Sequence, residues 1–346
     1  MAGIGRRTFA ACCSLIALSG AACSAPTAER SDTAAPADTA VPCADQNARY
    51  CAAQEGDLLD VNLEELRPTQ PSLGYDEVYY RLGRYTIGAD AADRLLDQWC
   101  VTNGQGGLDR ADAGATIAEP TSFRCAVALG SETPESTAEM KTVVIGPGGQ
   151  PYLTDGHHTL TSFWEAPGGG PATGVRLKVT GNLSSMEPAA FWDEMAARGW
   201  TWLRDADGAP ITPEQLPAGL GLQQFANDVY RGALYFVRDV GYTQSDDSPA
   251  FQEFYWGQWL REQPDPTLSP ESFNLDELPS YLSLVENVGG AIVALPPNTV
   301  IAAGRTAADL GRMDSFGQQA FEALGQPVDS VKPGKLAYAM AYKAGR

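Results

Sequence analysis

Residues 141–166 read KTVVIGPGGQPYLTDGHHTLTSFWEA, and this stretch decides the local structure around which we expect the chain to be organised. The β-branched run at 141–145 and a short extended run at 150–154 flank a Gly-Pro-Gly-Gly turn at 146–149. β-Branched residues favour strands, and glycine and proline favour tight turns. The pattern therefore predicts a β-hairpin.

A helix is expected directly after the hairpin, ending at residues 166–168 (APG) after about two and a half turns. Asp155 is a good N-cap residue, and Gly156, at the first helical position, leaves room for a ligand to approach. The free N–H groups of a first helical turn favour an anion. The hairpin is therefore expected to deliver His157 and His158, the two histidines of the chain, to an anion-binding helix end.

The histidine pair is the strongest candidate for chemistry. Helical spacing places His157 and His158 on different faces, so we expect one ring to point inward and the other towards the mouth of a site. A neutral imidazole can act as a general base or metal ligand and a protonated one can hold an oxyanion, so the pair could divide these tasks in phosphodiester hydrolysis. Asp155 could orient a ring or, with His158, bind a divalent metal ion.

A structural role explains the same motif. Asp155 would then cap the helix, Gly156 would permit the tight entry, and His157 would be a buried histidine with satisfied hydrogen bonds. Arg67 poses a similar choice, because the stiff backbone beside Pro68 could hold its guanidinium on a phosphate or carboxylate, while a surface salt bridge is the alternative. The residues alone leave both choices open.

Residues 1–22 predict an export signal peptide. Arg6 and Arg7 precede an apolar run at 9–18 that is too short to span a bilayer, and small residues follow it. The arginine pair also resembles the twin-arginine motif, which directs export of folded proteins. A Leu-Ser-Gly-Ala-Ala-Cys run resembles a lipoprotein cleavage site, so we expect a lipid on Cys23 that anchors the protein to a membrane. Ordinary cleavage before Cys23, giving a periplasmic or secreted protein, is the alternative.

Residues 23–56 are expected to hold a disordered tether, rich in Ala, Pro, Ser, Thr and Asp, and then the first of two cysteine pairs. Four cysteines remain after the signal, and an even number in an exported chain favours two disulfides. Among the three possible connectivities we choose sequence neighbours, Cys43 with Cys51 and Cys100 with Cys125. A zinc site is the rival interpretation, disfavoured because the chain has no Cys-x-x-Cys and its histidines lie elsewhere.

The composition limits the kind of partner. The chain of 346 residues has a formal net charge of -19 and 44% hydrophobic residues, which suffices for one or two globular units. Such acidity argues against a broad nucleic-acid-binding face, because Lys and Arg supply most of the non-specific affinity for a phosphate backbone. Any phosphate chemistry must then be local.

The hydrophobic periodicity predicts an α+β chain that becomes mainly helical after residue 187. The expected strands lie at 57–70 and 175–180, and the expected helices at 75–82, 90–99, 188–200, 220–242, 249–263, 276–295 and 307–324. Five tryptophans are better explained by packing against the sheet than by stacking on a substrate: Trp192, Trp200, Trp202, Trp256 and Trp259.

A series of short motifs is spread over roughly residues 57–261. They are Leu66-Arg67-Pro68-Thr69-Gln70, Glu77-Val78 with Arg81, Asp155-Gly156-His157-His158, Phe191-Trp192 with Met195, Gly199-Trp200, Leu216-Pro217, Asp228-x-Tyr230-Arg231 and Phe251-x-Glu253-Phe254-x-Trp256. The set resembles the ParB-like nuclease family of the ParB/sulfiredoxin superfamily. This resemblance implies an α+β domain at 57–262 with a ParB/sulfiredoxin-like mixed sheet, followed by a mainly helical C-terminal extension at 263–346.

The resemblance also implies what this chain has lost. Sulfiredoxins carry Gly-Gly-Cys-His-Arg at this helix start and use the cysteine as nucleophile, but here His157 replaces the cysteine and Thr159 the arginine. ParB partition proteins carry Gly-Glu-Arg-Arg for CTP, of which this chain keeps only Gly156, and it lacks a convincing helix-turn-helix. Sulfinic acid reduction and chromosome partitioning are therefore disfavoured.

The helix start itself matches the place where relatives bind phosphate. Gly156 and Thr159 are therefore expected to bind a phosphate, and Arg231, with Asp228 and Glu253, is expected to close over the same site or to form a salt bridge behind it. The first functional hypothesis is an exported, nuclease-like phosphodiester hydrolase, with a divalent metal ion as candidate cofactor. The alternative is a non-catalytic lipoprotein that binds a phosphorylated or anionic ligand there. A phosphotransferase is disfavoured, because ATP is scarce outside the cytoplasm.

Overall fold

The computed structural model describes residues 42–245 and 247–345. The predicted signal peptide, the twin-arginine motif, Cys23 and the expected tether up to residue 39 lie outside these residues. None of the described helices is long and apolar enough to cross a membrane.

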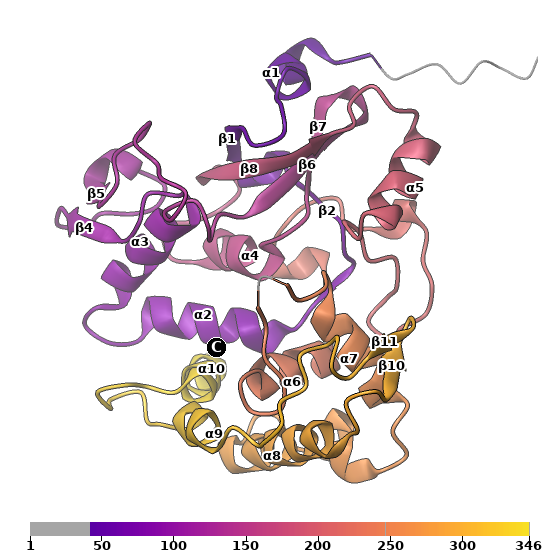
Figure 1. The fold of residues 1–346 in the computed structure, drawn as a ribbon. Helices are drawn as coiled ribbons and strands as arrows, with labels where there is room; N and C mark the ends of the chain where they lie inside the picture. The colour runs from indigo at the N-terminus through magenta and orange to yellow at the C-terminus, as the bar shows by residue number, and fades with distance from the viewer. Residues whose placement is uncertain (1–41, 246, 346) are drawn as a thin grey trace, which may run out of the picture. The chain divides into compact units, whose positions relative to one another are not determined.

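A five-stranded mixed sheet with the order β1-β8-β6-β7-β2 carries the candidate site (Figure 1). β6 and β7 form the predicted hairpin and pair antiparallel, with Val143 opposite Leu153. β8 runs parallel to β6 and antiparallel to β1, and β2 runs parallel to β7, so the predicted α+β class with a mixed sheet is confirmed. The strands are β1 (Leu58–Asn62), β2 (Arg67–Pro68), β6 (Thr142–Gly146), β7 (Gln150–Leu153) and β8 (Gly174–Asn182).

The β-branched strand β6 is buried on both faces of the sheet. Val143 and Ile145 point into the main core. The helices α2 (Tyr75–Thr86), α3 (Ala91–Thr102) and α4 (His157–Glu165) cover this core. Val144 points to the opposite face and packs against Phe191 and Met195 of α5 (Pro188–Ala197). The apolar run that predicts the hairpin therefore also forms the packing surface for the helices on both faces of the sheet.

Helix α4 (His157–Glu165) follows the hairpin and has nine residues, as its sequence predicts. Its start differs from the prediction, because Gly156 and not Asp155 is the N-cap, and no side chain caps the helix. Gly156 has a φ of +102°, a left-handed conformation that disfavours residues with a Cβ atom. A Cβ atom at this position would also lie 2.5 Å from Cγ of Lys141. The left-handed backbone and the close side chain of Lys141 therefore both require glycine at position 156.

The other helices of the first core are α2 (Tyr75–Thr86) and α3 (Ala91–Thr102). The predicted strand at 57–70 is interrupted by the 3-10 turn Leu63–Glu65, which separates β1 from β2. Three small sheets complete the strands: β3 (Ser72–Leu73) with β9 (Ala226–Asn227), β4 (Leu108–Ala111) with β5 (Phe123–Cys125), and β10 (Val300–Ala302) with β11 (Arg305–Thr306). A four-residue helix, α1 (Ala48–Cys51), precedes β1.

A second core is built from helices and confirms the predicted helical C-terminal part. Of the predicted helix at 307–324 only α9 is helical, because Gly311 turns the chain with a φ of +68°. A Cβ atom on Gly311 would collide with the carbonyl oxygen of Thr243. The helices of this core are α6 (Val229–Val237), α7 (Gln252–Arg261), α8 (Leu278–Ala294), α9 (Gln318–Leu324) and α10 (Lys335–Ala344), the last of which lies outside the predicted helices.

Helix α10 packs directly on α2 and joins the two cores (Figure 1). Gly83 permits the close approach, since a Cβ atom there would lie 2.5 Å from the carbonyl oxygen of Tyr338. Asp76, buried on α2, accepts a hydrogen bond from the Tyr281 hydroxyl at 3.0 Å and pairs with Lys343 Nζ at 3.0 Å. A buried carboxylate therefore ties α2 to both α8 and α10.

Both predicted disulfides, Cys43–Cys51 and Cys100–Cys125, are present. The first closes a short loop before β1, and the second joins α3 to β5.

The tryptophans pack in two different places. Trp192 of α5 and Trp200, which follows that helix, pack on the sheet in the cluster around Val144, as predicted. Trp256 and Trp259 are buried among the helices of the second core, so the prediction that they contact the sheet is wrong. Trp202 is half-buried and stacks on Phe254, with 4.7 Å between the ring centroids.

Candidate functional site

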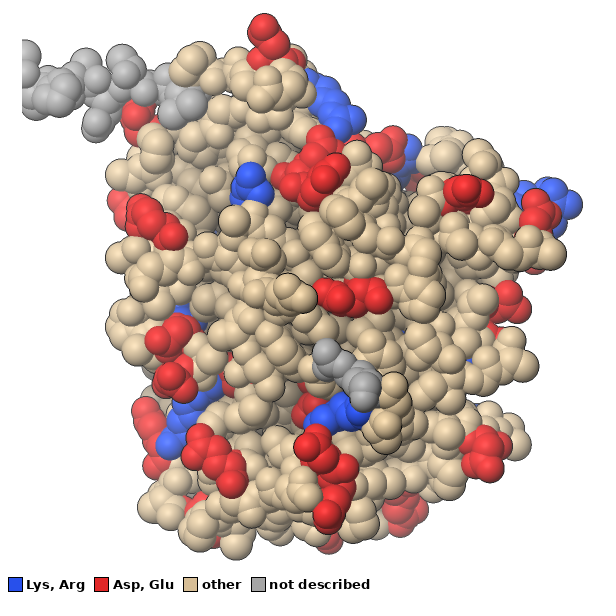
Figure 2. Space-filling model, turned by 180° about the vertical axis from the view of Figure 1, so that it is seen from behind, with Lys and Arg blue, Asp and Glu red and all other residues tan. Residues whose placement is uncertain are grey.

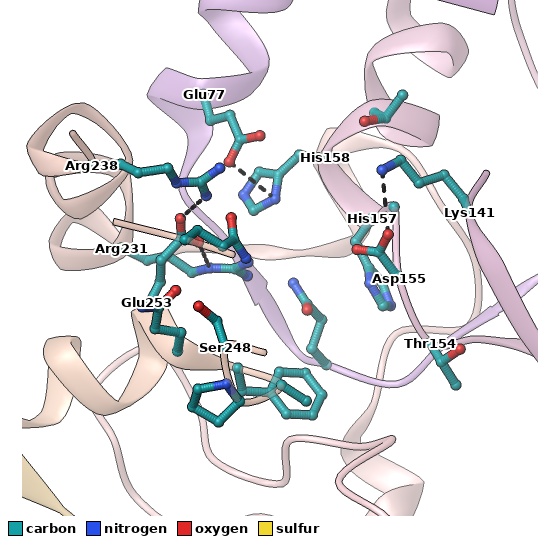
Figure 3. A pocket seen from close by; sticks show the side chains of 18 of the residues that line it. Glu77, Lys141, Thr154, Asp155, His157, His158, Arg231, Arg238, Ser248 and Glu253 are labelled. Atoms are coloured by element: carbon teal, nitrogen blue, oxygen red, sulfur yellow. Dashed lines mark hydrogen bonds and ion pairs between the residues drawn. The ribbon is translucent and has the colours of Figure 1, made fainter. Parts of the chain in front are cut away.

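A cavity of about 370 Å³ lies at the N-terminal end of α4 (Figure 3). Helix α2 contributes Glu77 and Arg81 to its wall, and the start of α4 contributes residues 155–159. Arg231 of α6 and Arg238, directly after that helix, enter from the second core. The remaining lining residues are Gln70, Lys141, Thr154, Gln244, Ser248, Pro249, Ala250, Phe251, Gln252 and Glu253.

The backbone at the start of α4 offers hydrogen-bond donors. Leu160 donates the first intrahelical hydrogen bond, to the Gly156 carbonyl oxygen at 2.8 Å. The N–H groups of the three preceding residues, 157–159, have no acceptor within the helix. These residues line the cavity, so the helix end carries the partial positive charge that favours an anion.

Both histidine rings point inward, whereas the sequence predicts one of them at the mouth of the site. His157 is 4% exposed and its Nε2 accepts a hydrogen bond from the Thr69 N–H at 3.2 Å. His158 is 6% exposed and its Nε2 accepts from the Gly74 N–H at 3.1 Å. The segment between β2 and α2 therefore crosses the helix end and is held there by two imidazoles.

These contacts fix the protonation of the rings. A ring that accepts at Nε2 carries its hydrogen on Nδ1 when it is neutral. In His158 this Nδ1 lies 3.3 Å from Oε2 of Glu77, so both nitrogens are engaged. Burial and the nearby Arg231 charge lower the pKa of His157 to about 3, against a raising effect of Asp155. Burial, followed by Arg231, also holds the pKa of His158 well below its usual value.

The carboxylates deep in the cavity are paired with guanidinium groups. Glu253 accepts from Arg231 Nε at 3.3 Å and from Arg238 Nη2, and Glu77 accepts from Arg81 Nη2 at 2.7 Å. Burial alone would raise the pKa of the Glu253 carboxyl, but Arg238 and Arg231 outweigh it and hold that pKa below its usual value. Glu253 is therefore charged at neutral pH. Both carboxylates are already bound to guanidinium groups.

The cavity wall is more positive than the rest of the molecule. It carries four cationic and three anionic side chains, with both histidines neutral, in a chain of net charge -19. Nη1 of Arg231 is buried and has no hydrogen-bond partner in the described chain. On the face of the molecule in Figure 2, by contrast, acidic side chains are widely scattered. The cavity can therefore accept one more anionic group.

Arg67 does not reach this cavity. Its guanidinium donates to the Ala218 carbonyl oxygen, and the residue does not line the wall. Gly156, Thr159 and Arg231, the other residues predicted to bind a ligand, do line it. The structure thus brings three of these four residues together.

The residues predicted to bind a metal ion are not arranged as a ligand set. Asp155 pairs with Lys141 at 3.3 Å, with its side chain 63% exposed, whereas both nitrogens of His158 are engaged elsewhere. Over residues 42–245 and 247–345, no three His, Cys, Asp or Glu side chains are grouped to hold a metal ion. Asp155 and His158 as they stand therefore do not fit a metal site.

Asp228 lies behind the cavity and not in its wall. Its Oδ1 accepts from the backbone N–H of Arg231 at 3.0 Å, which caps α6, and from Arg261 Nη2 at 2.6 Å. Arg238 and Gln252 are among the wall residues that escaped prediction. Gln252 lies within a motif of the resemblance, and no pattern in the sequence distinguishes either residue.

No curated protein matches this chain. Protein Atu1540 from Agrobacterium tumefaciens, known from a crystal structure, is similar with a TM-score of 0.45 and 19% sequence identity, over 68% of this chain and 91% of that one. The family described as "Putative ParB-like nuclease" matches residues 59–262, which include the hairpin, α4 and both arginine-bearing walls of the cavity. The chain belongs to this ParB-like nuclease family.

Proposed function

We propose that the cavity binds a small ligand through a phosphoryl or other anionic group at the start of α4. The observation that carries this proposal is the positive excess of the charged side chains that line the cavity. One of the lining residues, Arg231, also has a buried Nη1 without a hydrogen-bond partner in the described chain. A buried donor without an acceptor costs about 1–3 kcal/mol, more for a charged group. An anion that accepts from Arg231 removes this cost.

The helix end supplies further donors for the same anion. The N–H groups of residues 157–159 have no acceptor within the helix, and they precede the first intrahelical hydrogen bond. The neutral ring of His157 adds an Nδ1–H, for which the described residues provide no partner. An oxyanion with several lone pairs can accept from all of these groups, as phosphates do at helix N-termini.

The histidines support binding better than general-base catalysis. A general base needs a free lone pair within reach of the substrate proton. Nε2 of each ring already accepts a backbone hydrogen bond, and the remaining nitrogen carries the hydrogen. In this arrangement His157 donates to a ligand and His158 positions the segment before α2.

Phosphodiester hydrolysis is the second candidate, because the matched family is described as nuclease-like. Of the three predicted catalytic residues, Asp155 at the cavity rim is the one with an exposed side chain. The assay is turnover of a generic phosphodiester with and without Mg²⁺, Mn²⁺ or Zn²⁺. Turnover that both His157→Ala and His158→Ala remove would support catalytic histidines, whereas turnover retained in both folded variants would exclude that role.

The binding proposal is tested by isothermal titration of the purified protein with inorganic phosphate. Arg231→Met should weaken binding at least about tenfold, and Arg231→Lys should weaken it less, because lysine keeps the charge but not the fork of donors. Arg124→Met serves as the matched control, since Arg124 is exposed and pairs with Asp109 on β4, outside the cavity. Equal affinity in Arg231→Met and the control would contradict the proposal.

We infer, further, that the protein works outside the cytoplasm, attached to a membrane by a lipid on Cys23. The two disulfides support an oxidising compartment, and the N-terminal sequence supports export. Mass spectrometry of the mature protein should find Cys23 as an acylated first residue. An unmodified chain cleaved before Cys23, in the soluble fraction, would contradict the lipid anchor.

A further inference from the structure

Gln252 lines the same cavity and carries a hydrogen-bond acceptor that is unused in the described chain. The side chain is 2% exposed, and its Nε2 donates to the carbonyl oxygens of Thr243 at 2.8 Å and Leu310 at 2.9 Å. These two acceptors fix the orientation of the amide, because a flipped amide would bring its own oxygen against two carbonyl oxygens. Oε1 is left buried and without a partner in the described chain.

The position of this acceptor is fixed by the start of α7. Phe251 directly before it adopts a φ of +60°, a left-handed conformation that is uncommon for a residue other than glycine. Phe251 and Phe254 both pack on Trp202, with ring centroids 5.7 and 4.7 Å away. The aromatic cluster therefore holds the first turn of α7, and with it the Gln252 amide, against the cavity.

We propose that the ligand of this cavity is a small hydroxylated phosphoester or similar hydroxylated anion, whose hydroxyl donates to Oε1 of Gln252. This inference rests on the proposed anion binding and adds the second group of the ligand. An unpartnered buried acceptor is complementary to a donor, just as the unpartnered Arg231 Nη1 is complementary to an acceptor. The two together describe a ligand with an anionic end and a donating end.

A hydroxyl fits this donor better than an ammonium group does. The carboxylates of Glu77 and Glu253 are already paired with guanidinium groups, and the wall has a positive excess. The positive excess of the wall would repel an ammonium group, and Glu77 and Glu253 are not free to pair with it. A hydroxyl group carries no charge and is not repelled. The cavity of about 370 Å³ lies at the lower end of the range of roughly 300–1,000 Å³ typical for small-molecule sites, which indicates a small ligand.

The test compares two ligands that differ only in their hydroxyl groups. sn-Glycerol 3-phosphate and n-propyl phosphate share the carbon chain and the phosphate, and each is titrated into the wild-type protein beside inorganic phosphate. Glycerol 3-phosphate should bind about three- to tenfold more tightly than propyl phosphate, the value of one additional hydrogen bond. In Gln252→Met this ratio should fall to about one.

The outcomes separate this inference from the proposed function. If propyl phosphate and glycerol 3-phosphate bind the wild type equally well, the hydroxyl site is refuted and the anion site stands. If the ratio persists in folded Gln252→Met, the hydroxyl is recognised by another residue and the inference is likewise refuted. If inorganic phosphate and both esters fail to bind, the proposed function itself is refuted, and this inference with it. The comparison on the wild type needs no variant and therefore does not depend on the stability of Gln252→Met.

Discussion

The two buried histidines should make the protein less stable as the pH falls from 7.5 to 5.5. In the folded protein both rings are neutral, with the pKa of His157 at about 3 and that of His158 well below its usual value. In the unfolded chain each ring has a pKa of about 6.5 and takes up a proton over this range. Because the folded-state pKa values are depressed, the stability is fully present above pH 6.5 and is lost as the pH falls towards the folded-state pKa.

The magnitude follows from proton linkage. Between pH 7.5 and 5.5 each histidine lowers the free energy of unfolding by about 1.4 kcal/mol, or about 3 kcal/mol for the pair. The chain has only these two histidines, so no other imidazole takes up a proton in this window. The expected change is a large part of the stability of an ordinary domain.

The assay is urea unfolding at both pH values with the disulfides intact, in a buffer free of phosphate. The matched control is His157→Gln/His158→Gln, whose amide oxygens can still accept the Thr69 and Gly74 N–H groups but do not titrate. Its free energy of unfolding should be nearly equal at both pH values. An unchanged free energy in the wild type, or imidazole NMR signals of the folded protein that titrate near pH 6.5, would refute the assignment of Nε2 as acceptor in both rings.

Three further changes should alter the stability measured by urea unfolding. Gly156→Ala should lower it by about 1–3 kcal/mol, because of the left-handed backbone and the contact with the side chain of Lys141. Gly290→Ala, in α8 with open space around it, should raise it slightly, and equal effects of the two changes would contradict the role of the N-cap. Cys100→Ala/Cys125→Ala should lower it by about 3–4 kcal/mol, since this disulfide closes a separation of 25 residues, and a loss below about 1 kcal/mol would show that the unfolded chain gains little freedom. Lys343→Met should lower it by about 3 kcal/mol, because the buried carboxylate of α2 loses its cation, and full stability would mean that this carboxylate becomes protonated at no cost.

Local sequence patterns predicted the elements that carry the helix end. The hairpin, the nine-residue helix after it and both cysteine pairs depend on residues near one another in the chain, and the structure contains all of them. The N-cap was predicted at Asp155 because its side chain suits that position. The structure places it at Gly156, since the left-handed turn depends on the backbone and on a contact with Lys141 that the sequence does not display.

The directions of the side chains could not be predicted. Helical spacing gives the angle between His157 and His158 but not the segment that crosses over them and donates to both rings. The proline beside Arg67 stiffens its backbone without showing that its guanidinium reaches Ala218 instead of the cavity. Gln252 enters the wall through a tertiary arrangement of aromatic residues, which no local pattern shows.

Asp76 and Glu77 are neighbours in sequence but serve different parts of the molecule. Asp76 binds Tyr281 and Lys343 of the C-terminal helices, whereas Glu77 binds His158 and Arg81 in the cavity. A fragment that ends at residue 262, where the family match ends, would lack α10. Helix α2 would then lose this packing partner, and Asp76 would lose Lys343. The cavity therefore cannot be transferred to another protein as an isolated segment. An exchange of ligand specificity between members of the family must include the whole sequence up to the end of α10.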